Sequence, residues 1–128
     1  MSEIHWETLK LAAMDARSRA YAPYSSFTVG AALQTKDGRV FQGCNVENAS
    51  YGATICAERG ALAAAVAAGE RDLVALAIAT GAERPTPPCG ICRQCLSELG
   101  PGLRIRSYTS SGAFADYELS KLLPNAFR

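Results

Sequence analysis

Three cysteines stand where their sulfur atoms could converge on a single metal ion. Cys89 and Cys92 form a Cys-x-x-Cys pair after a proline-rich stretch, and Cys56 lies two residues before Glu58. Two cysteines with this spacing at the start of a helix can bind one zinc ion through both thiolates. The free N–H groups at a helix N-terminus also stabilise a thiolate and lower its pKa. The sequence therefore predicts one Zn²⁺ per chain, held by Cys56, Cys89 and Cys92, with a fourth position open to water as in catalytic sites.

Glu58 is the candidate catalytic residue, because a carboxylate beside a metal-activated water can move protons. On a regular helix, side chains two positions apart diverge by about 200° in direction. Glu58 can therefore face a metal held by Cys56 only if Cys56 lies at the helix edge with non-helical dihedral angles. We expect that geometry.

Arg59 follows Glu58 and could tune the charge of the site. Three thiolates on Zn²⁺ leave a net charge of −1, which makes the ion a poor Lewis acid. A cationic side chain that hydrogen-bonds to a ligand sulfur would withdraw part of that charge, as would the two helix N-termini. We expect Arg59 to contact a thiolate rather than to lie on an exposed helix face.

Other interpretations of the cysteines are open. Cys89 and Cys92 could form a thioredoxin-like redox pair, although Cys56 would then have no role. Cys95 could extend them into an iron–sulfur ligand run, but the fourth cysteine and its usual proline do not follow. A structural zinc would need Cys44 or Cys95 as a fourth ligand, and Cys95 lies about 9 Å along a regular helix axis from Cys89. We interpret Cys44 and Cys95 as buried, small apolar side chains.

The elements that must position these residues follow from the hydrophobic pattern. Asp37-Gly38 between two apolar runs is a hairpin signal, and the continuous apolar run at 73–80 is typical of a strand buried on both faces. Helices that alternate with buried strands indicate a layered α/β sandwich whose sheet is at least partly parallel. The predicted helices are 4–20, 56–68 and 89–99, the predicted strands are 27–35, 39–47, 73–80 and 103–109, and 119–127 is a short helix or coil.

Composition excludes several classes of protein. The chain has 128 residues, 48% of them hydrophobic, and 13 Lys+Arg against 12 Asp+Glu give a net charge of +1. This length suits one domain, residues 1–128, and the absence of a basic surplus argues against nucleic-acid binding. The mixed N-terminal segment lacks the features of a secretory signal, and the apolar runs are too short to cross a membrane. We therefore expect a cytoplasmic protein.

Two blocks of sequence carry a resemblance to a known family. They are Cys56-Ala57-Glu58-Arg59 and the segment 88–94, Pro-Cys-Gly-Ile-Cys-Arg-Gln. With them the chain resembles the small, homotetrameric cytidine deaminases of the three-cysteine zinc type, in which cysteine replaces the histidine ligand of other zinc deaminases. The resemblance implies a three-layer α/β/α sandwich around a mixed five-stranded sheet. Further matching blocks are 27–33, 43–51 and 122–127.

The resemblance also implies which residues contact the substrate. Asn45 and Glu47, which project from one face of a strand, match residues that bind the ribose 3′-hydroxyl. Phe27 and Ala57 match residues of the pyrimidine pocket. Phe127 matches an aromatic residue that can reach the site of a neighbouring subunit; a hydrophobic tail that closes its own core is the alternative.

The implied activity is hydrolytic deamination of cytidine and 2′-deoxycytidine in pyrimidine salvage, with release of ammonia. The implied assembly is a homotetramer with active sites near its subunit interfaces. A carboxylate at Glu47 would repel a 5′-phosphate, so nucleosides are expected over nucleotides. The alternatives are a related zinc deaminase for another aminopyrimidine, such as blasticidin S, and a non-enzymatic zinc or thiol-redox protein.

Overall fold

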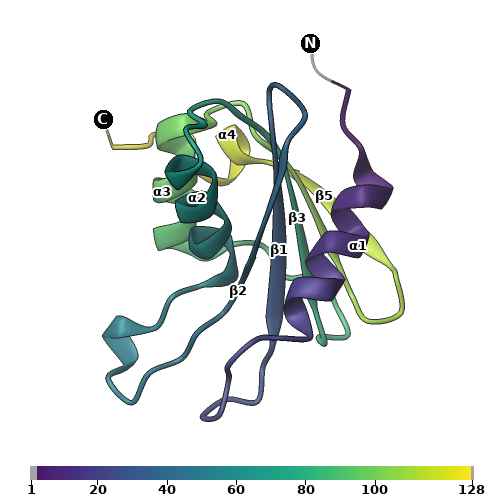
Figure 1. The fold of residues 1–128 in the computed structure, drawn as a ribbon, viewed down its shortest axis with the longest axis vertical. Coiled ribbons are helices and arrows are strands. Elements are labelled where there is room, and N and C mark those ends of the chain that lie inside the picture. The colour runs from purple at the N-terminus through teal and green to yellow at the C-terminus, as the bar shows by residue number, and fades with distance from the viewer. Residues whose placement is uncertain (1–2, 128) are drawn as a thin grey trace.

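One mixed sheet of five strands, in the order β2-β1-β3-β4-β5, forms the middle of the molecule (Figure 1). This computed structural model describes residues 3–127. Strands β3 and β4 run parallel, whereas the pairs β1–β2, β1–β3 and β4–β5 are antiparallel. The strands are β1 (Val29–Thr35), β2 (Val40–Cys44), β3 (Leu73–Thr80), β4 (Arg104–Tyr108) and β5 (Phe114–Glu118).

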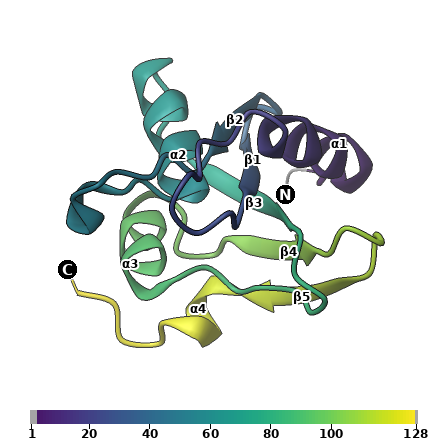
Figure 2. The same cartoon turned by 90° about the horizontal axis from the view of Figure 1, so that it is seen from below.

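Helices cover both faces of this sheet. Helix α1 (Trp6–Arg17) packs on one face, and α2 (Ala57–Ala67) and α3 (Gly90–Leu99) lie side by side on the other (Figure 2). The short helix α4 (Leu119–Leu122) follows β5 and contacts α3, and a 3-10 turn, η1 (Tyr51–Ala53), precedes α2. The three-layer α/β/α sandwich and its mixed five-stranded sheet confirm the expected fold class. Within residues 3–127, no helix is long and apolar enough to span a bilayer.

Strand β3 shows how the sequence divides the two cores. Its side chains alternate between the faces of the sheet, as a strand requires. Leu76 and Ile78 join the core under α2 and α3, whereas Ala75, Ala77 and Ala79 join the core under α1. The alanine face lets α1 approach the sheet closely, while the larger side chains fill the space beneath the pair of helices that carries the cysteines.

The loops on either side of the β1–β2 hairpin differ from the sequence prediction. Strand β1 begins at Val29 rather than at Phe27, because the backbone at Phe27 bonds to side chains instead of to a neighbouring strand. Strand β2 ends at Cys44, and Val46 forms isolated bridges with Tyr21 and Ile55. Asn45 and Glu47, which were expected on this strand, therefore lie just beyond its end, where backbone hydrogen bonds to Tyr21 continue the pairing without a regular ladder.

Candidate active site

Two helix N-termini bring the three predicted cysteines together. Cys56 is the N-cap of α2 and Cys89 the N-cap of α3, and both have extended dihedral angles (φ −72°, ψ 153° and φ −68°, ψ 168°). Cys92 lies in the first turn of α3 and is buried. All three Sγ atoms lie within 4.8 Å of one another. The requirement that Cys56 sit at the helix edge with non-helical dihedral angles is confirmed.

The sulfur geometry fits a tetrahedral zinc ion. The Sγ atoms of Cys56 and Cys89 are 3.9 Å apart. Two thiolates on one tetrahedral zinc, each at a bond length of about 2.3 Å, lie about 3.8 Å apart. These three residues could therefore hold Zn²⁺ with little movement, and three protein ligands leave one coordination position free. Cys44 and Cys95 lie outside this cluster and are half-buried rather than fully buried.

The charges around the sulfurs favour a thiolate at Cys56. Its pKa is lowered to about 5 by a hydrogen bond from the Cys92 thiol and by the nearby Arg59 guanidinium. The same hydrogen bond to Cys56, together with burial, raises the pKa of Cys92. Cys56 therefore ionises more readily than Cys92. Cys92 would have to lose its proton when zinc binds, since zinc ligands bind as thiolates.

Arg59 contacts the cluster as expected. Its Nη2 lies 3.5 Å from the Cys56 Sγ and donates to the Thr54 carbonyl oxygen at 3.2 Å. Its buried Nε has no hydrogen-bond partner within the described part of the chain. The hydrogen bond to Cys56 raises the pKa of Arg59, so the guanidinium remains charged. A permanent positive charge with spare donors beside the sulfurs suits a cluster of thiolates.

Glu58 is buried beside these sulfurs. It is 6% exposed and lines the same pocket as Cys56 and Cys89. Burial raises the pKa of its carboxyl group to about 7, and the negative charge of Cys56 adds to the rise. A carboxyl group with a pKa near neutrality can both accept and return a proton at physiological pH.

A pocket of about 200 Å³ opens over the cluster and brings most of the predicted site residues together. Phe27, Asn45 and Ala57 line it with Glu58. Sequence reasoning missed a second group of lining residues, which come from the end of β3, from β1 and from the loops before α2 and α3. These are Val29, Thr54, Ile78, Thr80, Thr86 and Pro87. Their side chains are ordinary for strands and loops, so no signal in the sequence marks them.

Glu47 lies in an adjoining hollow of about 400 Å³ that shares Thr54 with this pocket. Its Oε1 accepts hydrogen bonds from the backbone N–H groups of Tyr24 (2.9 Å) and Ser25 (3.1 Å), and its Oε2 accepts one from the Ser25 hydroxyl. The Ser25 hydroxyl is the main cause of a lowered pKa, so the carboxyl group stays ionised. Asn45 bonds to Phe27 and Val29 and Glu47 bonds to Tyr24 and Ser25, so both contact the chain around the start of β1 but line different hollows.

Phe127 lies away from the pocket of its own chain. Its side chain is 83% exposed, and a reciprocal pair of bonds ties its backbone to Gln94: the Gln94 Nε2 donates to the Phe127 carbonyl (2.9 Å), and the Phe127 N–H donates to Oε1 (3.1 Å). A tail that closes its own core would bury this ring. The structure does not support that alternative.

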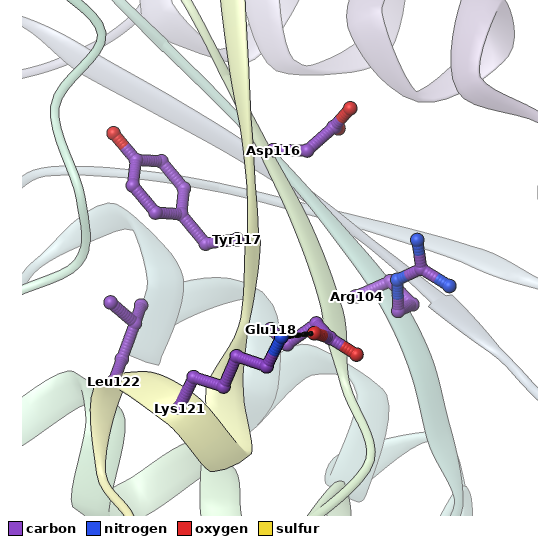
Figure 3. A pocket seen from close by; sticks show the side chains of 6 residues that line it. All are labelled: Arg104, Asp116, Tyr117, Glu118, Lys121 and Leu122. Carbon is purple, nitrogen blue, oxygen red and sulfur yellow. Dashed lines mark ion pairs between the residues drawn. The ribbon is translucent and has the colours of Figure 1, made fainter.

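A separate hollow of about 380 Å³ lies at the β4–β5 edge of the sheet (Figure 3). Lys121 and Glu118, which both line it, form an ion pair with an N–O distance of 2.9 Å. Arg104, which also lines it, is the β-ladder partner of Glu118. The positive and negative charges of its lining residues balance, and its lining includes none of the cysteines. We therefore place the candidate active site in the smaller pocket, over the cysteines.

Comparison with known proteins places this geometry in a family. The sequence model described as the cytidine and deoxycytidylate deaminase zinc-binding region matches residues 4–105. The chain therefore belongs to this zinc-dependent deaminase family, and it is an enzyme.

Individual relatives agree closely in sequence and in structure. A cytidine deaminase from Halalkalibacterium halodurans is 51% identical over 116 residues, which are 90% of this chain and 88% of the relative. A cytidine deaminase from Mycobacterium tuberculosis is 42% identical over 127 residues, 99% of this chain and 92% of the relative. The crystal structure of a cytidine deaminase from Burkholderia pseudomallei superposes with a TM-score of 0.91 at 50% identity, covering 98% of this chain and all of that one.

Removing the guanidinium of Arg59 should weaken the metal site. We expect Arg59→Ala to lower zinc affinity or turnover by about 10- to 100-fold, the usual effect of losing a group that hydrogen-bonds to a metal ligand. Zinc content after dialysis against a chelator and ammonia release from cytidine measure the two effects. Arg71→Ala, in which the lost guanidinium bonds to the Val66 and Glu70 carbonyl groups, is the matched control. Unchanged zinc content together with unchanged turnover would remove Arg59 from the metal site.

Proposed function

We propose that the chain hydrolyses cytidine and 2′-deoxycytidine to uridine and 2′-deoxyuridine, releasing ammonia. The observation that carries this proposal is the buried carboxyl group of Glu58, which shares one pocket with the sulfurs of Cys56 and Cys89. Membership of the deaminase family and relatives named cytidine deaminase support it.

In this proposal Glu58 carries every proton transfer. Zinc held by the three sulfurs would supply a Lewis acid that lowers the pKa of water in the pocket. Glu58 accepts one proton from the attacking water and delivers it to N3 of the pyrimidine as the water oxygen adds to C4. It then takes the second proton from the new C4 hydroxyl group and passes it to the amine, which leaves as ammonia while the C4 carbonyl forms. Burial supports this role because a carboxyl group with a pKa of about 7 holds and releases a proton with little free-energy change.

The rest of the pocket suits a pyrimidine nucleoside. Phe27 and Ile78 are apolar pocket walls against which a planar base can pack. Asn45 lines this pocket and Glu47 lines the neighbouring hollow, and a carboxylate and an amide together can bind sugar hydroxyl groups. The ionised Glu47 would repel a 5′-phosphate, so we expect deoxycytidine to be preferred over dCMP.

The proposed assembly is a homotetramer whose subunits complete one another's sites. Phe127 is 83% exposed, and hydrogen bonds to Gln94 hold its backbone in place. An exposed aromatic ring on a fixed backbone suits insertion into a neighbouring subunit. Tyr24 and Tyr51, which flank the hollow beside Glu47, are also exposed. A cytoplasmic location and a role in pyrimidine salvage complete the proposal.

A panel of substrates tests the function directly. The purified, zinc-loaded chain is incubated with cytidine, deoxycytidine, dCMP, cytosine and blasticidin S, and ammonia is measured. We expect release from the two nucleosides, far less from dCMP, and loss of activity after chelation that added zinc restores. Release from blasticidin S alone would favour the related deaminase, and release from none of them would contradict the proposed function.

A further inference from the structure

The loop between α1 and β1 holds Phe27 in place through side chains rather than through secondary structure. The Phe27 N–H donates to the Ser25 Oγ at 3.0 Å, and its carbonyl oxygen accepts from the Asn45 Nδ2 at 2.8 Å. Between them, Ser26 has a φ of 61°. A residue other than glycine in this left-handed region is strained and persists only where its surroundings hold it. The contacts on either side of Ser26 therefore decide where Phe27 lies.

Ser25 is the residue that links Phe27 to Glu47. Its hydroxyl donates to the Glu47 Oε2 and at the same time accepts the N–H of Phe27. Its own N–H donates to the Glu47 Oε1 at 3.1 Å. A hydroxyl group has one donor and can accept as well, so both functions are in use. The resulting chain of bonds runs from the carboxylate of Glu47, through one hydroxyl, to the backbone of an aromatic residue that lines the pocket.

We propose that Ser25 is a positioning residue that fixes the aromatic wall of the substrate pocket to the carboxylate beside it. The inference rests on the proposed function, in which Phe27 packs against the base and Glu47 binds the sugar. Ser25 does not line the pocket over the cysteines; it lines the hollow that holds Glu47, and it acts on the pocket through the backbone of Phe27. Base and sugar recognition are thereby coupled, because a shift of the Glu47 carboxylate moves the backbone of Phe27.

Loss of the hydroxyl should weaken substrate binding and leave the chemical step intact. In Ser25→Ala the N–H of Phe27 loses its acceptor and Glu47 loses a donor, while the cysteines and Glu58 are unaffected. A hydrogen bond of ordinary strength corresponds to a rise in KM for cytidine of about five- to tenfold, with kcat within about twofold of wild type. Ser25→Thr, which keeps the hydroxyl, should restore KM. Ser25→Cys, which keeps the volume but offers only a weak donor and acceptor, should not.

A double-mutant cycle separates this role from general loosening of the loop. If Ser25 acts through Phe27, then Ser25→Ala should raise KM in the wild type but have little further effect in Phe27→Leu. Ser18→Ala is the matched control, because the Ser18 hydroxyl lies in the same connection and bonds to the Asp15 carbonyl oxygen. Additive effects in the cycle, or a KM in Ser25→Ala equal to that of wild type, would overturn the inference.

A measurement without substrate keeps the inference separate from the proposed function. Backbone hydrogen exchange at Phe27 should accelerate in Ser25→Ala and return to the wild-type rate in Ser25→Thr. An unchanged exchange rate at Phe27 in Ser25→Ala would overturn the inference whether or not the enzyme acts on cytidine. Wild-type protein that releases no ammonia from any nucleoside would instead contradict the proposed function.

Discussion

Glu58→Gln is expected to reduce turnover of cytidine by about 10²- to 10⁴-fold, the range that general acid–base catalysis contributes. Glutamine keeps the shape of the side chain but cannot accept the proton of the attacking water or return it to the leaving amine. Zinc content should remain one ion per chain, because the three sulfurs do not depend on this carboxyl group. KM should change little, so the loss is expected in kcat and in kcat/KM alike.

Two controls show that this loss is chemical rather than structural. Glu98→Gln removes an exposed carboxyl group from α3 and should leave turnover unchanged. Thermal unfolding of the metal-free proteins at pH 8 should show Glu58→Gln to be at least as stable as wild type. Burial raises the folded-state pKa of Glu58 from 4.5 to about 7, so the ionised carboxyl group destabilises the fold above pH 7, and this penalty disappears as the pH falls towards 4.5. Near-normal turnover in Glu58→Gln would rule out the proposed mechanism.

The metal cluster could be predicted from the sequence because its geometry follows from local rules. Cys56 and Cys89 precede runs of helix-forming residues, so both fall at N-caps, where extended dihedral angles turn their side chains towards the helix N-terminus. The spacing of Cys92 then fixes its place in the first turn of α3. The contact between Arg59 and Cys56 is local as well, since the two residues are three positions apart.

The far side of the pocket could not be predicted in the same way, because it depends on contacts between distant segments. The hydrogen bonds to Glu47 come from Tyr24, which is 23 positions away in the chain, and from Ser25, which is 22 positions away. Outside the pocket, the position of Phe127 likewise depends on its bonds to Gln94, 33 positions away. No periodicity or spacing rule connects residues that meet only once the sheet has formed.

Strand β5 shows a different limit of sequence reasoning. Phe114–Glu118 lies at the edge of the sheet, and its residues alternate between exposed and half-buried. Edge strands carry charged side chains that discourage pairing with other chains, so their apolar pattern is weak. The residues of the chain alone predicted four strands, and the fifth was expected only from the resemblance to a family.

The second large effect of a mutation is expected at Gly43, where helix α2 packs closely against strand β2. An added Cβ at this position would lie 2.3 Å from both the carbonyl oxygen of Ala57 and the backbone nitrogen of Ala61, and 2.9 Å from the carbonyl carbon of Gly60. These are backbone atoms of the helix, so no side-chain rotation can relieve the overlap. Helix α2 would have to move away from the sheet, and Cys56 is the N-cap residue of this helix.

Gly43→Ala is therefore expected to lower the free energy of unfolding by at least about 3 kcal/mol, the upper part of the range for overpacking a core. Zinc retention should fall with it, because a displaced α2 moves Cys56 away from Cys89, which sits on a different helix. Thermal unfolding and zinc content of the purified protein measure the two effects. Gly102→Ala is the matched control, since its added Cβ meets nothing within 4 Å. A Gly43→Ala protein with the stability and zinc content of the control would show that α2 can shift without disturbing the metal site, and that the close contact with β2 does not hold Cys56 in place.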